Sequence, residues 1–278
     1  MKGIVVFYHS GCQDGFGAAW AAWKKFGNRA TYIPLRHADG VPKELKKKEV
    51  YLLDITFFGD TLKKVVKDNT SVTILDHHAT AKNEIKKATI WKYGTTSSGA
   101  GLSWKFFHPD QKTPRLIAYV EAQDLWRFTL PHTKEFNAVI ESLPFDFQIW
   151  SKAAKELENA KKRKDYLVRG RAMLTAESAL VRSIVKNAED AKILGHRARV
   201  VNCPILESSV GHALYRGEKK VVAVMWARKS GRIKVSLRSD GSPDVSKIAK
   251  HFGGGGHKAA SGFSLKIGRS LPWKYSKK

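Results

Sequence analysis

Residues 71–78 read Ser-Val-Thr-Ile-Leu-Asp-His-His, a short apolar run that ends in one carboxyl group and two imidazoles. An apolar, β-branched run of this length is typical of a buried β-strand, which places Asp76, His77 and His78 at the carboxyl end of the strand. Turns normally use Gly or Asn at such a position, and polar side chains there are costly to bury. The triplet therefore predicts a strand whose end carries chemistry.

The surrounding sequence predicts that this strand belongs to a mostly parallel sheet. Short apolar segments alternate with amphipathic ones along the first half of the chain, the pattern of parallel strands joined by helices. The expected strands are residues 3–8, 29–35, 50–55 and 71–75, and the expected helices are residues 18–26, 60–67, 97–107 and 114–124. The fold class is α/β, and side chains that follow different strands are expected to share one crevice.

The second half of the chain predicts a helical connector followed by a smaller α/β domain. Apolar residues recur near helical spacing over residues 148–190, which contain no Pro, so we expect one long helix there. The expected strands are 197–202, 219–227 and 232–238, the expected helices are 208–216 and 245–251, and the polar tail 270–278 is expected to fray. The predicted domain boundaries are 1–147, 148–192 for the connector and 193–278.

The charge of the chain favours a polyanionic partner. The 278 residues include 50 Lys and Arg against 25 Asp and Glu, a formal net charge of +25. Such a surface attracts nucleic acid first and anionic membranes second. A lysine-rich solubilising surface is the alternative interpretation, because charge alone is a non-specific signal.

The sequence carries no pattern of a membrane span or a secretory signal. No apolar run approaches the roughly 18–20 residues that cross a bilayer, and the apolar stretch near the N-terminus is short for a signal peptide. Cys12 and Cys203 make no disulfide framework, which is typical of a reducing compartment. We therefore expect a cytoplasmic protein with no membrane partner.

Acidic and histidine residues follow several of the predicted strands. They occupy residues 9–14, Asp54 and residues 76–78, and Asp124 ends a predicted helix. Carboxylate and imidazole donors suit Mn²⁺ or Mg²⁺ better than they suit a thiolate-rich zinc site. A single Asp after a strand is usually a helix cap or turn residue, and that interpretation stands for Asp54 or Asp124 alone. The set as a whole predicts a divalent-metal site.

Other residues leave two interpretations open. The hydroxyl and N–H groups at residues 97–100 either cap a helix or bind an anion. Trp126 and Arg127 either stack on a nucleobase or, in the case of the Trp, pack in the core. Four further histidines are assigned to surface or structural roles: His37, His132, His196 and His212.

Three stretches of the sequence resemble motifs of the DHH phosphoesterase superfamily. The triplet Asp76-His77-His78 is similar to the signature of the superfamily, and residues 9–16 resemble the His-x-x-x-x-Asp-Gly-Phe motif of its oligoribonuclease-like group. Residues 252–263, Phe-Gly-Gly-Gly-Gly-His-Lys-Ala-Ala-Ser-Gly-Phe, resemble the glycine-rich motif of the DHH-associated C-terminal domain. The resemblance covers nearly the whole chain and extends to RecJ-type exonucleases, nano-RNases and cyclic-dinucleotide phosphodiesterases.

The resemblance implies roles for individual residues. It implies that residues 1–147 form the catalytic, metal-binding DHH domain, with Asp54 bridging two metal ions, His78 beside the scissile phosphate and Asp76 orienting an imidazole. The implied metal ligands are His9, Asp14, Asp54, His77 and Asp124. The implied substrate-binding residues of the C-terminal domain are Arg238, Gly254, Gly255, Gly256 and His257.

The chain departs from the family pattern at Cys12. The first motif of the family normally supplies Asp-x-Asp, whereas this chain has Cys12-Gln13-Asp14. Cys12 is therefore a doubtful ligand: either it binds metal as a thiolate, or it is a small apolar side chain and one metal site is weak.

The function implied is that of a metal-dependent phosphodiesterase. Two ions, Mn²⁺ or Mg²⁺, would activate a water that hydrolyses short oligonucleotides to mononucleotides. The expected partners are short single-stranded RNA or DNA and, as an alternative, cyclic or linear dinucleotide signals, with a homodimer as the candidate assembly. An alternative of another class is a catalytically impaired nucleic-acid-binding protein, for which Cys12 is the motivating feature.

Overall fold

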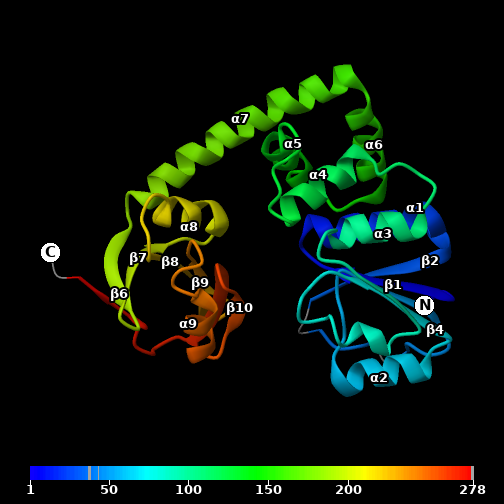
Figure 1. Cartoon of the computed structure of the whole chain (residues 1–278), viewed down its shortest axis with the longest axis horizontal. Helices are drawn as coiled ribbons and strands as arrows, with labels where there is room; N and C mark the ends of the chain where they lie inside the picture. The colour runs from blue at the N-terminus through cyan, green and yellow to red at the C-terminus, as the bar shows by residue number, and fades with distance from the viewer. Residues whose placement is uncertain (37–38, 43, 277–278) are drawn as a thin grey trace. The chain divides into compact units, whose positions relative to one another are not determined.

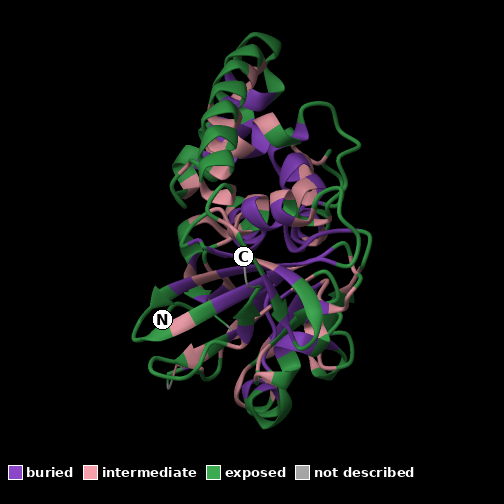
Figure 2. Cartoon of the chain, turned by 90° about the vertical axis from the view of Figure 1, so that its left-hand side faces the viewer, coloured by how far each residue is buried: buried purple, intermediate pink, exposed green. Residues whose placement is uncertain are grey.

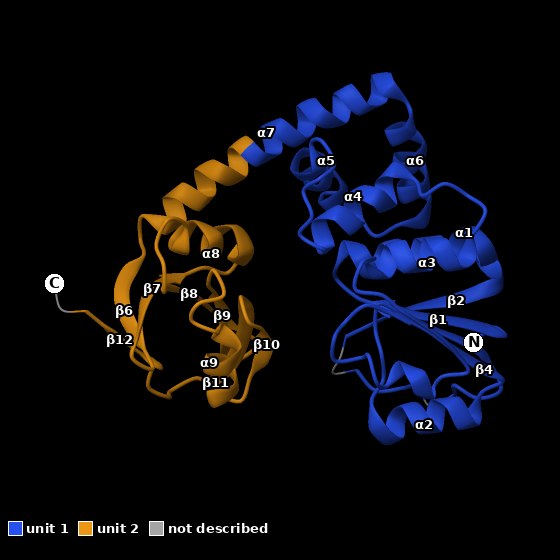
Figure 3. Ribbon diagram, in the orientation of Figure 1, with its two compact units in different colours: residues 1–174 blue, residues 175–278 orange. Residues whose placement is uncertain are grey.

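The computed structural model describes residues 1–36, 39–42 and 44–276, so His37 lies outside the described residues. The chain divides into two compact units, residues 1–174 and 175–278 (Figure 3).

The other three histidines assigned to surface or structural roles, His132, His196 and His212, are exposed. Among the described residues, no helix has both the length and the apolar character required to cross a bilayer.

The first unit is built on a five-stranded sheet in which all neighbouring strands are parallel, as expected. Across the sheet the strands lie in the order β2 (Ala30–Leu35), β1 (Ile4–His9), β3 (Glu49–Leu53), β4 (Ser71–Asp76) and β5 (Ile90–Tyr93). The register pairs Tyr8 with Leu53, and Leu53 with Leu75. The three central strands therefore end at the same level.

Helices cover both faces of this sheet. The helices α1 (Gln13–Phe26) and α3 (Gly99–Phe107) lie on one face and α2 (Gly59–Asp68) on the other (Figure 1). Successive strand residues point to opposite faces, so Val6 packs with α1 and α3 whereas Val5 and Phe7 pack with α2. Strands β3 and β4 are buried along most of their length, and Figure 2 colours the buried residues of the chain purple. Burial on both faces explains why the strands read as continuous apolar runs.

The helical segment after the sheet is interrupted, contrary to the single helix expected over residues 148–190. The helices α4 (Arg115–Asp124) and α5 (Thr133–Glu141) precede α6 (Phe147–Glu158) and α7 (Ala160–Val185). The break lies at Asn159, whose Oδ1 accepts hydrogen bonds from the backbone N–H groups of Lys161 and Lys162. An Asn that caps the following helix competes with continuation of the preceding one.

The second unit contains a seven-stranded mixed sheet in which β7 and β8 are parallel and the other pairs are antiparallel. Its strands are β6 (Glu189–Ile193), β7 (His196–Asn202), β8 (Val222–Lys229), β9 (Arg232–Arg238), β10 (Gly255–His257), β11 (Ala260–Lys266) and β12 (Trp273–Tyr275). Two helices, α8 (Glu207–Tyr215) and α9 (Val245–His251), complete the unit.

The expectation of a frayed polar tail at residues 270–278 is wrong for the described part of that segment. Strand β12 pairs with β6, and the Trp273 side chain is buried beside Trp226. Burial of one large aromatic side chain stabilises the strand despite its polar neighbours.

Candidate metal centre

Seven side chains meet at the carboxyl edge of the parallel sheet. His9 ends β1, Asp54 follows β3, and the triplet 76–78 begins with the last residue of β4. Asp14 lies in the first turn of α1, and Asp124 is the last residue of α4. These residues come from distant parts of the sequence, and the level ends of the three central strands bring them together.

The imidazole of His77 lies at the centre of a group of carboxylates. Its Nε2 is 3.3 Å from Oδ1 of Asp54, 3.5 Å from Oδ2 of Asp124 and 3.7 Å from Oδ2 of Asp14. Asp54 also lies 3.6 Å from Nδ1 of His9 through its second oxygen. Asp54 therefore connects the groups around His77 and His9.

The donor atoms form three overlapping groups that could each hold a metal ion. Within each group, the potential ligand atoms lie within 4.8 Å of one another. The groups are His9–Cys12–Asp54, Asp54–His77–His78 and Asp14–His77–Asp124. Oδ1 of Asp54 is buried and accepts no hydrogen bond of good geometry among the described residues. A buried carboxylate oxygen of this kind, beside imidazole and carboxylate donors, fits a divalent cation.

Burial and mutual charge shift the pKa values of this centre. Burial, followed by the negative charges of Asp54 and Asp124, raises the pKa of Asp14 well above its usual range. Burial opposes ionisation of Asp54 too, but the nearby imidazoles of His77 and His9 outweigh it and lower the pKa of Asp54 to about 2. For His77, burial lowers the pKa, but Asp54 and the other carboxylates outweigh it and raise the pKa to about 9. Without a cation, protons neutralise the crowded carboxylates.

The N-terminus of α3 is directed at Asp14. The backbone N–H of Gly99 donates to Oδ2 of Asp14 at 2.7 Å, and the N–H of Ala100 donates to Oδ1 at 2.9 Å. The Ser98 hydroxyl meanwhile accepts from the N–H of Gly101 at 3.3 Å. The helix is therefore capped by Ser98, and its N-terminus also binds an anion, the carboxylate of Asp14.

Gly99 is required by the close approach of α3 to the centre. A Cβ at this position would lie 2.4 Å from the Cβ of Asp54, closer than van der Waals contact permits. In the sequence, the only indication that Gly99 lies near the metal centre was the run of small residues at 97–100.

Asp76 lies one layer outward and fixes the ring of His78. Oδ1 of Asp76 is 2.8 Å from Nδ1 of His78 and also accepts the His78 backbone N–H at 2.9 Å. The second oxygen of Asp76 accepts the Thr56 hydroxyl at 2.7 Å. This is the arrangement that an orienting role requires. Nothing in the sequence pattern pointed to Thr56.

Cys12 lies within the cluster and also caps α1. Its Sγ accepts the backbone N–H of Gly15 at 3.3 Å and lies 3.1 Å from Nδ1 of His9. Burial raises the pKa of the thiol, and the negative charge of Asp54 raises it further. The thiol therefore favours its protonated form in the absence of a cation.

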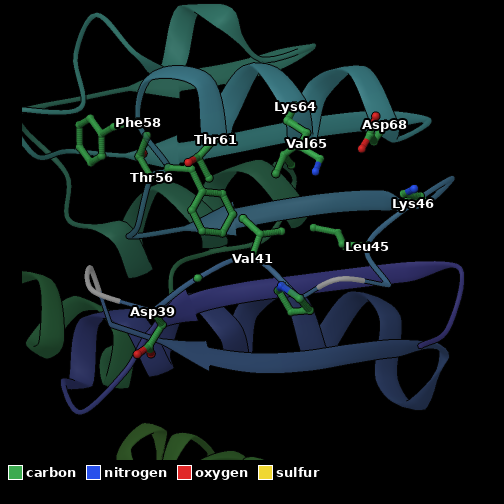
Figure 4. Close-up of a pocket in the computed structure, with 13 residues that line it drawn as sticks. Asp39, Val41, Leu45, Lys46, Thr56, Phe58, Thr61, Lys64, Val65 and Asp68 are labelled. Carbon is green, nitrogen blue, oxygen red and sulfur yellow. The ribbon is translucent and has the colours of Figure 1, made fainter.

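A separate cavity of about 490 Å³ lies between α2 and the segment around residues 39–46 (Figure 4). None of the predicted site residues lines it. Thr56 does line it, and Thr56 is the residue whose hydroxyl donates to Asp76. The cavity is thus joined to the metal centre through one hydrogen bond.

The substrate-binding residues expected in the second unit gather around one hairpin. In the sheet register His257 pairs with Ala260, and Ala260 pairs with Arg238. Residues directly opposite one another project from the same face, so Arg238 and His257 lie in one row, roughly 10 Å apart, with a small Ala between them.

The glycines before His257 belong to structure and not to a loose loop. Gly255 and Gly256 form part of strand β10 at the edge of the sheet. The N–H of Gly254 donates to the carbonyl of Ala249 at 2.8 Å. Gly254 also passes so near the backbone of Gly262 that its added Cβ would lie 2.1 Å from the Gly262 oxygen.

Comparison with known proteins gives a matching family for the C-terminal unit. Residues 201–271 match the DHHA1 domain family. Over 94% of its length the chain is 28% identical to Uncharacterized protein R106 of Acanthamoeba polyphaga mimivirus, covering 67% of that relative.

Solved structures share the fold of the chain at low sequence identity. The DHH domain of a member of a family of ribosomal proteins aligns with a TM-score of 0.62 and 13% identity, over 95% of this chain and 83% of that one. An exopolyphosphatase-related protein from Bacteroides fragilis gives 0.57 and 14%, over 97% and 88%. The pGpG-specific phosphodiesterase PggH from Vibrio cholerae gives 0.54 and 14%, over 96% and 94%.

The chain combines a parallel-sheet unit, in which Asp76-His77-His78 lie at the end of one strand, with a C-terminal segment that matches the DHHA1 domain. The chain thus has a C-terminal segment that matches the DHHA1 domain family and shares its fold with solved structures that include a DHH domain.

Proposed function

We propose that this protein is a metal-dependent phosphodiesterase that hydrolyses short oligonucleotides to mononucleotides. The observation that carries the proposal is the cluster around Asp54 and His77, where carboxylates and imidazoles crowd together at the end of a parallel sheet. Such a cluster is costly to bury without a cation. Divalent cations bound there would supply water activation and charge neutralisation at a phosphate.

The residues of the chain divide the remaining work. Asp14, Asp54, His77 and Asp124 are proposed to hold the cations, with His9 and, as a doubtful further ligand, Cys12. Asp76 orients His78, which is proposed to face the scissile phosphate or the leaving group. The Arg238–His257 row of the second unit is proposed to bind a terminal phosphate or base, since Arg offers a two-pronged grip on phosphate. The net charge of +25 favours a polyanionic substrate.

A linear or cyclic dinucleotide is the second candidate substrate. It is favoured by the shared fold of this chain and a pGpG-specific phosphodiesterase. The chemistry would be the same, and only the size of the ligand would differ.

The test is hydrolysis of end-labelled RNA and DNA of two to about twenty-five nucleotides, with a linear and a cyclic dinucleotide alongside, in Mn²⁺ and in EDTA. Rapid loss of the shortest oligomers, abolished by EDTA and by His77→Ala but not by the exposed-histidine control His196→Ala, supports the proposal. Preference for the cyclic compound supports the second candidate. Tight binding of long strands with no turnover of any substrate would contradict both and would assign the chain to nucleic-acid binding alone.

A further inference from the structure

Two exposed aromatic side chains follow the last residue of the metal centre. Trp126 is 63% exposed and Phe128 is 37% exposed. Their rings meet edge to face with centroids 5.0 Å apart. The interpretation of Trp126 as a core residue is therefore wrong, and an exposed aromatic pair needs another explanation.

The segment that carries this pair is held in place by several contacts. Arg127 donates from its guanidinium to the carbonyls of Thr96 at 3.1 Å and Thr95 at 3.4 Å. Farther along, the Thr133 hydroxyl donates to the carbonyl of Leu130 at 2.7 Å. Side chains on a segment tied at both ends present a pre-organised surface, which lowers the entropic cost of binding.

The backbone at Trp126 adopts a conformation that a large side chain rarely takes. Its φ is +54°, in the left-handed region that favours Gly. The following N–H, of Arg127, donates to the carbonyl of Ala122 at 2.7 Å, as in a helix C-cap that normally uses Gly. A Trp in this place costs stability relative to Gly, and its side chain buries little area in return.

The aromatic pair is continuous with the metal centre. Asp124, whose Oδ2 lies 3.5 Å from Nε2 of His77, is only two residues before Trp126. Their Cα atoms are therefore at most about 7.6 Å apart. Arg127 donates to the carbonyls of residues 95 and 96, and α3, whose first N–H groups bind Asp14, begins three residues later.

We infer that Trp126 and Phe128 form a stacking subsite for a nucleobase of the substrate, next to the phosphate that the metal centre cleaves. The inference rests on the proposed function and deepens it by naming the element that binds a base. Aromatic rings stack on any base without reading its hydrogen-bonding edge. Lys134 lies 5.2 Å from the centroid of the Phe128 ring and adds positive charge beside the platform.

The inference is tested with three matched substrates: a 5′-phosphorylated dinucleotide and two analogues that each lack one base. Trp126→Ala is expected to raise KM for the intact dinucleotide about tenfold, the order of one lost stacking contact. The same substitution should leave KM unchanged for the analogue that lacks the stacked base, because that analogue does not make the stacking contact even with the wild type. Trp126→Phe should restore most of the loss. Trp91→Ala, which removes another exposed Trp on β5, is the matched control.

Each result decides the inference. Equal increases of KM for all three substrates would show that Trp126 only stabilises its own segment. An unchanged KM with an altered oligomeric state would assign the aromatic pair to a protein interface. Either result overturns the inference. Should the wild type cleave none of the substrates, the proposed function fails separately. Fluorescence anisotropy then measures the binding of labelled single strands to the wild type and to Trp126→Ala in EDTA. Weaker binding of the intact strand by Trp126→Ala, with no loss of binding for a fully abasic strand, supports the subsite. Equal binding of the intact strand by the two proteins overturns it.

Discussion

The candidate sites of the two units differ in burial and charge. In the first unit Asp14 and Asp54 are 3% and 1% exposed, and each lies within 3.7 Å of the His77 imidazole. In the second unit Gly255, Gly256 and His257 lie on an exposed edge strand. Charged groups that are buried and held in fixed positions stabilise the transition state, whereas an exposed strand edge contributes mainly to substrate binding. Substitutions at the metal centre of the first unit should therefore lower kcat, and substitutions at the exposed edge of the second unit should raise KM.

The largest effect is expected from His77→Ala. It removes the imidazole that lies within 3.7 Å of three carboxylates, so those carboxylates lose their shared partner. We expect a loss of at least about 10³-fold in kcat/KM and weaker Mn²⁺ binding, because several kcal/mol of charge stabilisation depend on the centre. Steady-state kinetics and metal titration measure both effects. If the His77→Ala variant turned over substrate in Mn²⁺ at the wild-type rate, the assignment of His77 as a metal ligand would be refuted.

A smaller effect is expected from Asp76→Asn. The substitution keeps the shape of the side chain but removes the charge that orients His78. A loss of about 10- to 100-fold in kcat, with little change in KM, is expected for an outer positioning residue. Asp165→Asn, at an exposed position of α7, is the control. A change in KM alone would place Asp76 in substrate binding.

The affinity of the first unit for metal should fall as pH decreases. In the metal-free protein the pKa of His77 is raised to about 9, so below that pH a cation must displace its proton. Between pH 9 and pH 7 the affinity for Mn²⁺ should fall about tenfold per pH unit if one proton is displaced. Calorimetry in two buffers of different ionisation enthalpy counts the protons released. An affinity that is constant over this range would contradict the predicted exchange.

The smallest effect on catalysis is expected from Arg238→Ala in the second unit. Its guanidinium lies in the row with His257 and is held by the Leu237 carbonyl and the Ser208 hydroxyl. We expect KM to rise about tenfold with a smaller change in kcat, if the grip is equal in the ground state and the transition state. A larger loss in kcat would move Arg238 into the chemistry and erase the contrast between the units.

Much of the first unit could be predicted from the sequence because its strands are buried on both faces. Runs such as residues 3–8 and 71–75 are mostly apolar, and the predicted strands match β1 and β4 closely. Strands β5, β6, β10, β11 and β12 were missed, because a short or half-buried strand carries a weak pattern. The one long helix expected over 148–190 was wrong because a single capping Asn outweighs periodicity.

The sequence by itself determined the kinds of donor atom and their places at strand ends, since parallel strands must deliver their carboxyl ends to one edge. Only the tertiary structure decided how these groups combine. It directed the start of α3 at Asp14, tied Thr56 to Asp76, and left Trp126 exposed beside Asp124. Each of these facts depends on contacts between segments distant in sequence, which packing specifies and local pattern does not.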